Sequence, residues 1–198
     1  MDIFKSASGG ETPHEKCTSR LKTVLEKNER VHKLIDAIEG LGCKVPSDFF
    51  SCRPCEDKVS GGFVVDSGSS HQITATPYKP KIILCEVDVD KVTFENTVVH
   101  ELVHAYDQCK MKIDWKNCLH HACTEVRASS LSGECDYRQE FNRGHMKMQR
   151  GGLECVQRRA TMSVAANPHC TEVAKDAVIA VYDYCSRDIA PLDRADQK

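Results

Sequence analysis

The segment Val-Val-His-Glu-Leu-Val-His-Ala-Tyr, at residues 98–106, contains the strongest pattern in this chain. On an α-helix, His100 and His104 lie one turn apart on the same face, so both imidazoles can reach one metal ion. Glu101 follows the first histidine, where its carboxylate can lie beside the metal and take a proton from water. The neighbouring residues are uncharged, as a helix inside a core requires. This H-E-x-x-H spacing predicts the helix of a zinc hydrolase. The alternative is a buried helix whose histidines are hydrogen-bonded and bind no metal.

A catalytic zinc ion usually takes three protein ligands and leaves a fourth position for water, and two carboxylates are candidates for the third. Glu125 lies on the next expected helix, whereas Asp107 lies one turn past His104 on the same helix. Ligands from two helices close a tetrahedral face more easily than three side chains of one straight helix. We therefore favour Glu125, which is the gluzincin arrangement. Asp107 is the alternative third ligand, or it orients an imidazole. Surface or packing roles are expected for the other histidines of the second half, His120, His121 and His145.

Composition describes an ordinary folded protein. The chain has 198 residues, of which 40% are hydrophobic and 28% charged, enough to bury a core. Its formal net charge of −2 gives no general attraction to nucleic acid or anionic membranes. No apolar run approaches the roughly 20 residues that span a bilayer, and the first ten residues resemble neither a secretory signal nor an Arg-rich transit peptide. We expect a soluble or peripheral protein with a flexible leader at 1–12, one domain at 13–190 and a tail at 191–198.

Cysteine is the unusual component, because the chain contains 12. An even, high count suggests a disulfide framework in an oxidising compartment, although no secretory signal is present. The mitochondrial intermembrane space reconciles both observations. The alternative is a reduced protein whose thiols pack as small hydrophobic groups. For the lone C-x-x-C at Cys52 and Cys55 we favour structural disulfide bonding over a separate zinc site or redox chemistry.

Hydrophobic periodicity predicts an α+β protein. A first helix starts at Pro13, capped by Thr12, and runs to Gly40. An extended region follows, with strands expected at 61–65, 71–75 and 81–87 and a turn at Ser67-Gly68. We expect an extended substrate to add to an exposed sheet edge, formed by the 81–87 strand. The second half is helical, with helices expected at 93–109, 117–132, 152–166 and from 171 onwards.

Several segments resemble one known family, the mitochondrial inner-membrane metalloproteases that process ATP synthase subunit a. The segments are residues 98–108, 114–115, 122–129, 131–135, 154–160 and 163–168. The animal member is also called the Ku-binding protein. The resemblance covers roughly residues 15 to 190. It implies a zincin-type peripheral enzyme on the intermembrane-space face of the inner membrane. His100 and His104 would be its zinc ligands and Glu101 its catalytic residue; the third ligand is not fixed by the family motif.

The resemblance also implies a chaperone role in assembling the membrane sector of the ATP synthase, independent of proteolysis. A purely non-proteolytic chaperone is therefore an alternative function, and a Ku-associated factor in double-strand break repair is another. Residues 138–159 are basic and could meet anionic phospholipid, an acidic partner or DNA. We interpret them as a solvated helix face and expect no direct nucleic-acid binding.

Overall fold

The computed structural model describes residues 10–55, 59–64, 80–145 and 151–197. These residues form an α+β fold with a small three-stranded sheet and mostly helices, as the sequence predicts. The helices and strands are α1 (Pro13–Lys27), α2 (Glu29–Gly40), β1 (Phe50–Arg53), β2 (Gly61–Val64), β3 (Lys81–Cys85), α3 (Lys91–Met111), α4 (Cys118–Leu131), α5 (Tyr137–Asn142), α6 (Gly151–Ala166) and α7 (Ala174–Cys185). Short 3-10 helices occupy Thr171–Val173 and Arg194–Gln197.

The expected helix start is confirmed, but the single helix to Gly40 is wrong. The Thr12 hydroxyl accepts a hydrogen bond from the Glu15 amide, and the Glu15 carboxylate accepts one from the Thr12 amide. The helix instead ends before Asn28, which has extended dihedrals of φ −90° and ψ 111°. Its side chain accepts a hydrogen bond from the Val31 amide and so caps α2. Asn ends one helix and starts another because its short side chain competes for backbone donors.

The sheet has the strand order β1-β3-β2, with β1 parallel and β2 antiparallel to β3. Strands expected at 61–65 and 81–87 are present as β2 and β3, whereas the one at 71–75 and the Ser67-Gly68 turn fall outside the described residues. The expectation that the 81–87 strand forms an exposed edge is wrong, because β3 is hydrogen-bonded on both sides. Among the described strands, β2 forms the edge beside α3. No periodic pattern indicated β1 or α5, because both elements are too short to show one.

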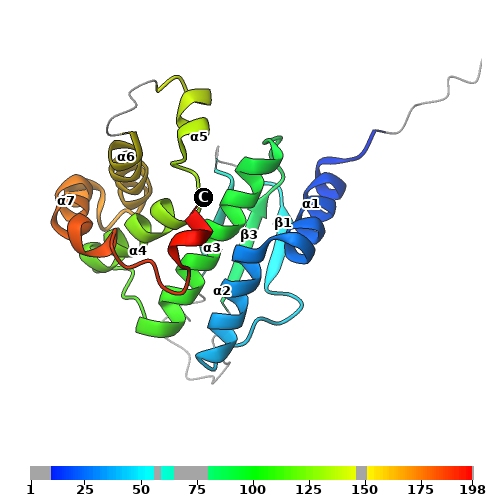
Figure 1. The fold of residues 1–198 in the computed structure, drawn as a ribbon, viewed down its shortest axis with the longest axis horizontal. Helices are drawn as coiled ribbons and strands as arrows, with labels where there is room; N and C mark the ends of the chain where they lie inside the picture. The colour runs from blue at the N-terminus through cyan, green and yellow to red at the C-terminus, as the bar shows by residue number, and fades with distance from the viewer. Residues whose placement is uncertain (1–9, 56–58, 65–79, 146–150, 198) are drawn as a thin grey trace, which may run out of the picture.

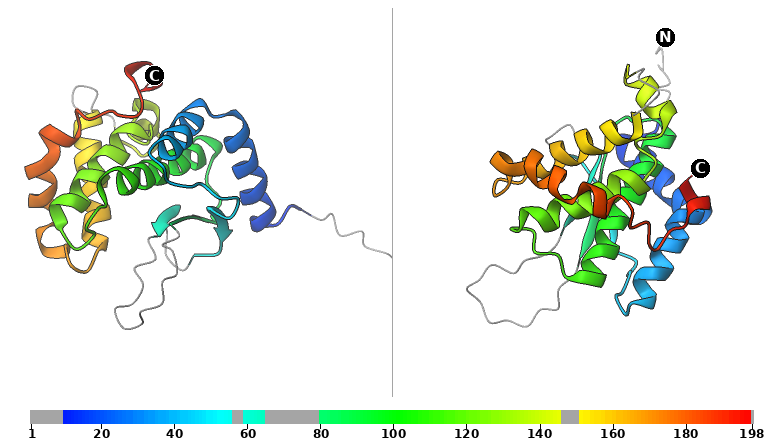
Figure 2. Two further views of the ribbon diagram at one scale, coloured as in Figure 1. Left: turned by 90° about the horizontal axis from the view of Figure 1, so that it is seen from below. Right: turned by 60° about the vertical axis from the view of Figure 1, so that its left-hand side comes forward.

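Helix α3 runs through the middle of the molecule, with α1, α2 and the sheet on one side and the C-terminal helices on the other (Figure 1). One hydrophobic core joins α3 to α1, α2 and β3, and a second lies between α4, α6 and α7. The segment after α7 returns toward α2 (Figures 1 and 2), where Leu192 enters the first core and Lys33 pairs with Asp196 at 2.6 Å. The N-terminal helices and the C-terminal helices therefore pack on opposite sides of α3, which has buried residues on all its faces in its middle turns.

All twelve cysteines are paired in six disulfides, which confirms the expected framework. Cys52 bonds to Cys17 and Cys55 to Cys85, so the C-x-x-C residues take part in two separate structural bridges. The other pairs are Cys43–Cys109, Cys118–Cys170, Cys123–Cys185 and Cys135–Cys155. Three of these four cross-link the C-terminal helices and their connections, whose core is built largely from small side chains.

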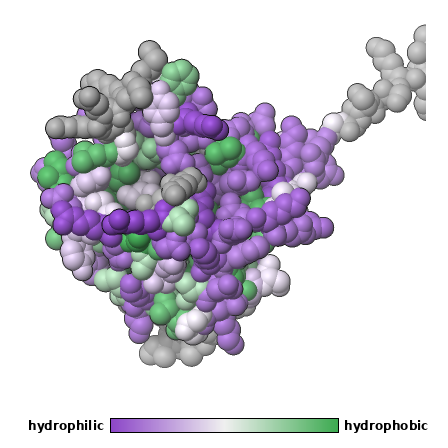
Figure 3. Space-filling model, in the orientation of Figure 1, coloured by the Kyte–Doolittle hydropathy of each residue, from purple (hydrophilic) through white to green (hydrophobic). Residues whose placement is uncertain are grey.

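The face seen in Figure 3 is mostly hydrophilic over α1 and α2, while hydrophobic residues are more frequent over the C-terminal helices. Exposed apolar side chains there include Leu153, Ile179 and Tyr184. In the described part of the chain, no helix combines the length and apolar character needed to cross a bilayer.

Candidate metal centre

Helix α3 presents the two histidines from its buried middle. Asp90 caps the helix by accepting hydrogen bonds from the Val92 and Thr93 amides. Leu102 and Val103, between the histidines, are fully buried and anchor the helix in the first core. The rings of His100 and His104 consequently lie side by side, with centroids 4.8 Å apart. The predicted pairing of the imidazoles on one face is present in the structure.

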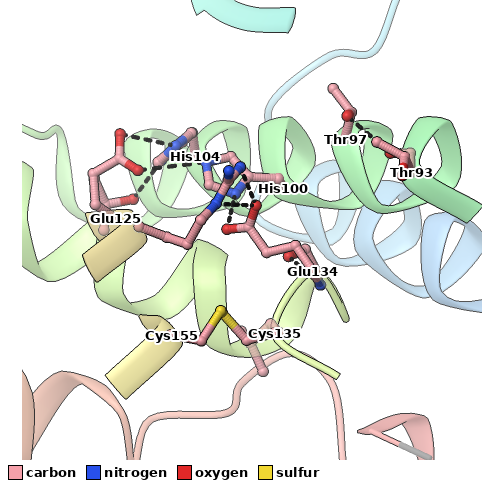
Figure 4. Close-up of polar contacts among 12 residues, drawn as sticks. Thr93, Thr97, His100, His104, Glu125, Glu134, Cys135 and Cys155 are labelled. Atoms are coloured by element: carbon pink, nitrogen blue, oxygen red, sulfur yellow. Dashed lines mark hydrogen bonds and ion pairs between the residues drawn. A yellow bond between two sulfur atoms is a disulfide. The ribbon is translucent and has the colours of Figure 1, made fainter. Parts of the chain in front are cut away.

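Glu125 on α4 completes a group of three side chains that could hold a metal ion. One ligand atom from each of His100, His104 and Glu125 lies within 4.8 Å of the others. The Glu125 oxygens are 3.4 Å from Nε2 of His100 and 3.5 Å from Nε2 of His104 (Figure 4). Oxygen Oε2 of Glu125 is buried and has no hydrogen-bond partner among the described residues. A buried carboxylate that faces two imidazole nitrogens, one from each of its oxygens, and keeps Oε2 unpaired suits a divalent metal, and this donor set fits zinc.

Asp107, the alternative ligand, lies outside this group. Its carboxylate instead accepts hydrogen bonds from Nε of Arg127 at 3.0 and 3.1 Å and from the Thr124 hydroxyl at 2.8 Å. Since Thr124 donates to Asp107, its oxygen is free to accept from Nδ1 of His104, 2.9 Å away. With its proton on Nδ1, His104 has a lone pair on Nε2, the nitrogen that faces Glu125. Asp107 is thus connected to His104 through Thr124, which is the contact that the second role considered for it requires.

His100 also has an acidic neighbour behind its ring. Nδ1 of His100 is 3.3 Å from Oε1 of Glu134, while the other oxygen of Glu134 accepts hydrogen bonds from Arg159 at 2.6 and 3.0 Å. In Figure 4, Glu125 and Glu134 approach the histidine pair from opposite sides. Each histidine therefore directs one nitrogen toward Glu125 and the other toward a polar group that fixes it.

Burial and charge set opposite pKa shifts in the two histidines. Burial lowers the pKa of His104 to about 3, which keeps this ring neutral and able to donate its lone pair. Burial also disfavours a charged His100, but Glu134 and Glu125 outweigh it and raise the pKa of His100 well above its usual value. Although burial acts to raise the pKa of Glu125, the neighbouring histidines hold it well below its usual range. The two carboxylates thus create a buried negative environment that attracts a cation.

Glu101 lies beside the two histidines in a cleft of about 580 Å³. Burial is the largest cause that raises the pKa of Glu101, to about 7. A backbone hydrogen bond from Phe63 on β2 acts in the opposite direction and ties the carboxylate to the edge strand. A carboxylate whose pKa lies near neutrality can both accept and return a proton. The cleft also exposes His100 and is bordered by β2 and α6. A larger, more apolar cavity of about 760 Å³, between the end of α2 and the C-terminal part of α3, is lined by neither histidine.

Two residues of the site were not predicted from the sequence. Glu134 had no spacing relation to the H-E-x-x-H motif that would have indicated its contact. His121, expected to have a surface or packing role, is buried, and its Nε2 is 3.3 Å from Glu125 Oε1. The spacing of four residues between His121 and Glu125 could have indicated this contact. His120 and His145 are exposed, as expected.

Comparison with known proteins identifies the family. The model of the peptidase M76 family matches residues 15–193. This chain belongs to the peptidase M76 family. A relative from Homo sapiens, named "Mitochondrial inner membrane protease ATP23 homolog", is 40% identical over 92% of this chain and 71% of its own. A Schizosaccharomyces pombe protein named "Mitochondrial inner membrane protease atp23" is 34% identical over 90% of this chain and 91% of its own. No solved structure matched the chain, so the zincin fold stays a prediction.

Proposed function

We propose that this chain is a zinc metalloendopeptidase in which His100, His104 and Glu125 hold the metal and Glu101 is the general base. The observation that supports it most directly is the convergence of two imidazole nitrogens on a buried carboxylate, one of whose oxygens has no hydrogen-bond partner among the described residues. Membership of a peptidase family supports the peptide-cleaving class of reaction. When bound, zinc polarises the scissile carbonyl and lowers the pKa of water.

The residues of the chain provide the proton transfers. Glu101 lies in the cleft beside His100 and takes a proton from the attacking water. It then gives that proton to the leaving amine as the peptide bond breaks. Glu101 is 6% exposed, so bulk water competes little for the proton. Its pKa near 7 suits both transfers.

An extended substrate would pair with β2, because among the described strands this one forms the sheet edge beside the cleft. Main-chain hydrogen bonds to such an edge would hold the peptide over Glu101. This replaces the 81–87 strand as the expected docking edge.

The test compares Glu101→Gln with a matched variant of the same helix, Glu95→Gln. Glu95 is paired with Lys91 near the start of α3 and does not line the cleft. We expect Glu101→Gln to lower peptide cleavage by about 10²- to 10⁴-fold while the bound zinc stays stoichiometric. Glu95→Gln should retain both properties. Undiminished cleavage by a zinc-loaded Glu101→Gln protein would contradict the assignment.

We further propose that the enzyme acts peripherally at the mitochondrial inner membrane, on the intermembrane-space side. The names of the relatives support a location at the mitochondrial inner membrane. The six disulfides support a location in an oxidising compartment. A precursor of ATP synthase subunit a is the proposed substrate, and assembly of the membrane sector the proposed chaperone role, both on family resemblance. Rescue of ATP synthase assembly in a deletion strain by Glu101→Gln, with the precursor left uncleaved, would separate the two roles.

Nucleic-acid binding gains no support from the basic stretch at 138–159. Arg158 and Arg143 pair with Glu140, and Arg159 pairs with Glu134. The charges of these arginines are therefore largely compensated within the protein. Association with Ku stays a prediction from the family resemblance.

A further inference from the structure

The arrangement behind His100 points to a role for Glu134. This glutamate lies in the short connection between α4 and α5 and is 6% exposed. Its Oε1 is 3.3 Å from Nδ1 of His100, while Nε2 of the same ring faces Glu125. The imidazole thus lies between the proposed metal position and a buried carboxylate.

Nδ1 of His100 and Oε1 of Glu134 are both buried without a hydrogen-bond partner among the described residues. Buried polar atoms in native proteins are nearly always paired, so two such atoms facing one another at 3.3 Å form a natural donor and acceptor. If Nδ1 keeps its proton and donates a hydrogen bond to Oε1, Nε2 has its lone pair free for a metal. A carboxylate behind a metal-binding histidine fixes the tautomer and ring orientation and makes the ligand more basic.

Glu134 is itself held in place from α6. Arg159 donates hydrogen bonds to Oε2 of Glu134 from both Nε and Nη2, which leaves Oε1 for His100. The disulfide Cys135–Cys155 joins the same two segments, because Cys135 follows Glu134 and Cys155 precedes Arg159 by one helical turn. The ion pair therefore restrains the carboxylate itself, and the disulfide, drawn below Glu134 in Figure 4, restrains the backbone next to it.

We propose that Glu134 is a positioning residue for His100, held by Arg159 and by the Cys135–Cys155 disulfide. This inference rests on the proposed metal site. It gives α6 a defined part in metal binding, since this helix fixes the acceptor of one histidine. His104 has a different acceptor, Thr124, so each ring is oriented separately.

Zinc affinity is the first measurement, made by competition with a chromophoric chelator on the full, oxidised chain. Glu134→Ala should raise the zinc Kd by about 10- to 100-fold. Glu134→Gln keeps an acceptor oxygen and should recover part of that loss. The matched control is Glu140→Gln. Glu140 is also buried and its carboxylate pairs with Arg143 and Arg158, but among the described residues that carboxylate pairs with no histidine ring. Its zinc Kd should equal that of the wild type.

A purely structural role would not change the protonation of His100, so nitrogen-15 NMR of the imidazole is the second measurement. We expect the proton on Nδ1 in the zinc-loaded wild type, with a shifted Nδ1 signal in Glu134→Ala and an unchanged one in Glu140→Gln. Replacing both Cys135 and Cys155 by serine should also weaken zinc binding. The disulfide Cys17–Cys52 joins α1 to β1, away from the histidines. Replacing both of these cysteines by serine should leave zinc binding unchanged.

The outcomes separate this inference from the proposed function. Wild-type protein that binds no zinc would overturn both. Zinc bound by the wild type, with an unchanged Kd and unchanged His100 signals in Glu134→Ala, would overturn only the positioning role. If Glu140→Gln weakened zinc binding equally, the positioning role would also be overturned, because the effect would then come from the loss of any buried ion pair near the site.

Discussion

Thr124 connects His104 to Asp107, and replacing it by valine tests whether this connection matters for the metal site. The side chain is 1% exposed, and its hydroxyl is 2.9 Å from Nδ1 of His104 and 2.8 Å from Asp107. Valine has nearly the same shape but lacks the hydroxyl. The variant therefore leaves the Nδ1–H group of His104 buried without an acceptor, whereas Asp107 keeps its two hydrogen bonds from Arg127.

An unsatisfied buried donor costs about 1–3 kcal/mol, and we expect Thr124→Val to lower the free energy of unfolding by this amount. Without its acceptor, His104 also loses the preference for the tautomer whose Nε2 faces Glu125. The zinc Kd should therefore rise by about 10- to 100-fold, as for other groups that orient metal-binding histidines.

Thr124→Ser is the matched control, since it keeps the hydroxyl and removes only a buried methyl group, at a cost of about 1 kcal/mol. Urea unfolding of the metal-free protein gives the stability term, and chelator competition gives the zinc Kd. The serine variant should bind zinc as the wild type does. Equal zinc affinities for the valine and serine variants would refute the argument that the hydroxyl orients His104.

Three further predictions follow from the contacts around the site. Arg127→Met leaves the buried Asp107 carboxylate without its ion pair and should cost about 3–5 kcal/mol in thermal unfolding; a cost below that of removing the exposed pair Lys91–Glu95 would contradict this. Removing the metal with a chelator should lower the thermal midpoint, and zinc at 100 times its Kd should restore about 2.7 kcal/mol; no response to zinc would argue against a bound metal. In Gly61→Ala the new Cβ would lie 2.9 Å from a methyl of Thr97 and 3.0 Å from a backbone oxygen of β3, so β2 must shift and KM should rise with zinc unchanged. Gly62→Ala, with open space around the new Cβ, is its control, and equal KM values would exclude β2 as the docking edge.

Periodic and locally coded features could be predicted well. The boundaries of α3 and α4 match the expected helices closely, because their apolar residues recur at helical spacing and Asp90 and Asn117 cap them. The expected start at Thr12 is present for the same reason. The break at Asn28 was missed, since apolar residues continue at helical spacing on both sides of it and only the capping hydrogen bond reveals it.

The disulfide pairing and the contacts of Glu134 could not be predicted, because they join segments far apart in the chain. The sequence indicates that twelve cysteines form bridges, but only the packing of α4 against α6 and α7 brings the C-terminal partners together. Likewise, Glu134 and Arg159 meet only once α6 has packed in place.

The H-E-x-x-H spacing alone determined that His100 and His104 share a helix face, because four residues make about one turn of any α-helix. It also placed Glu101 next to them. Tertiary structure decided the rest: Glu125 converges with the imidazoles while Asp107 turns to Arg127, as the packing of α4 on α3 requires. Local spacing fixes neighbours along one helix, but the partners of a buried polar group depend on which other element covers it.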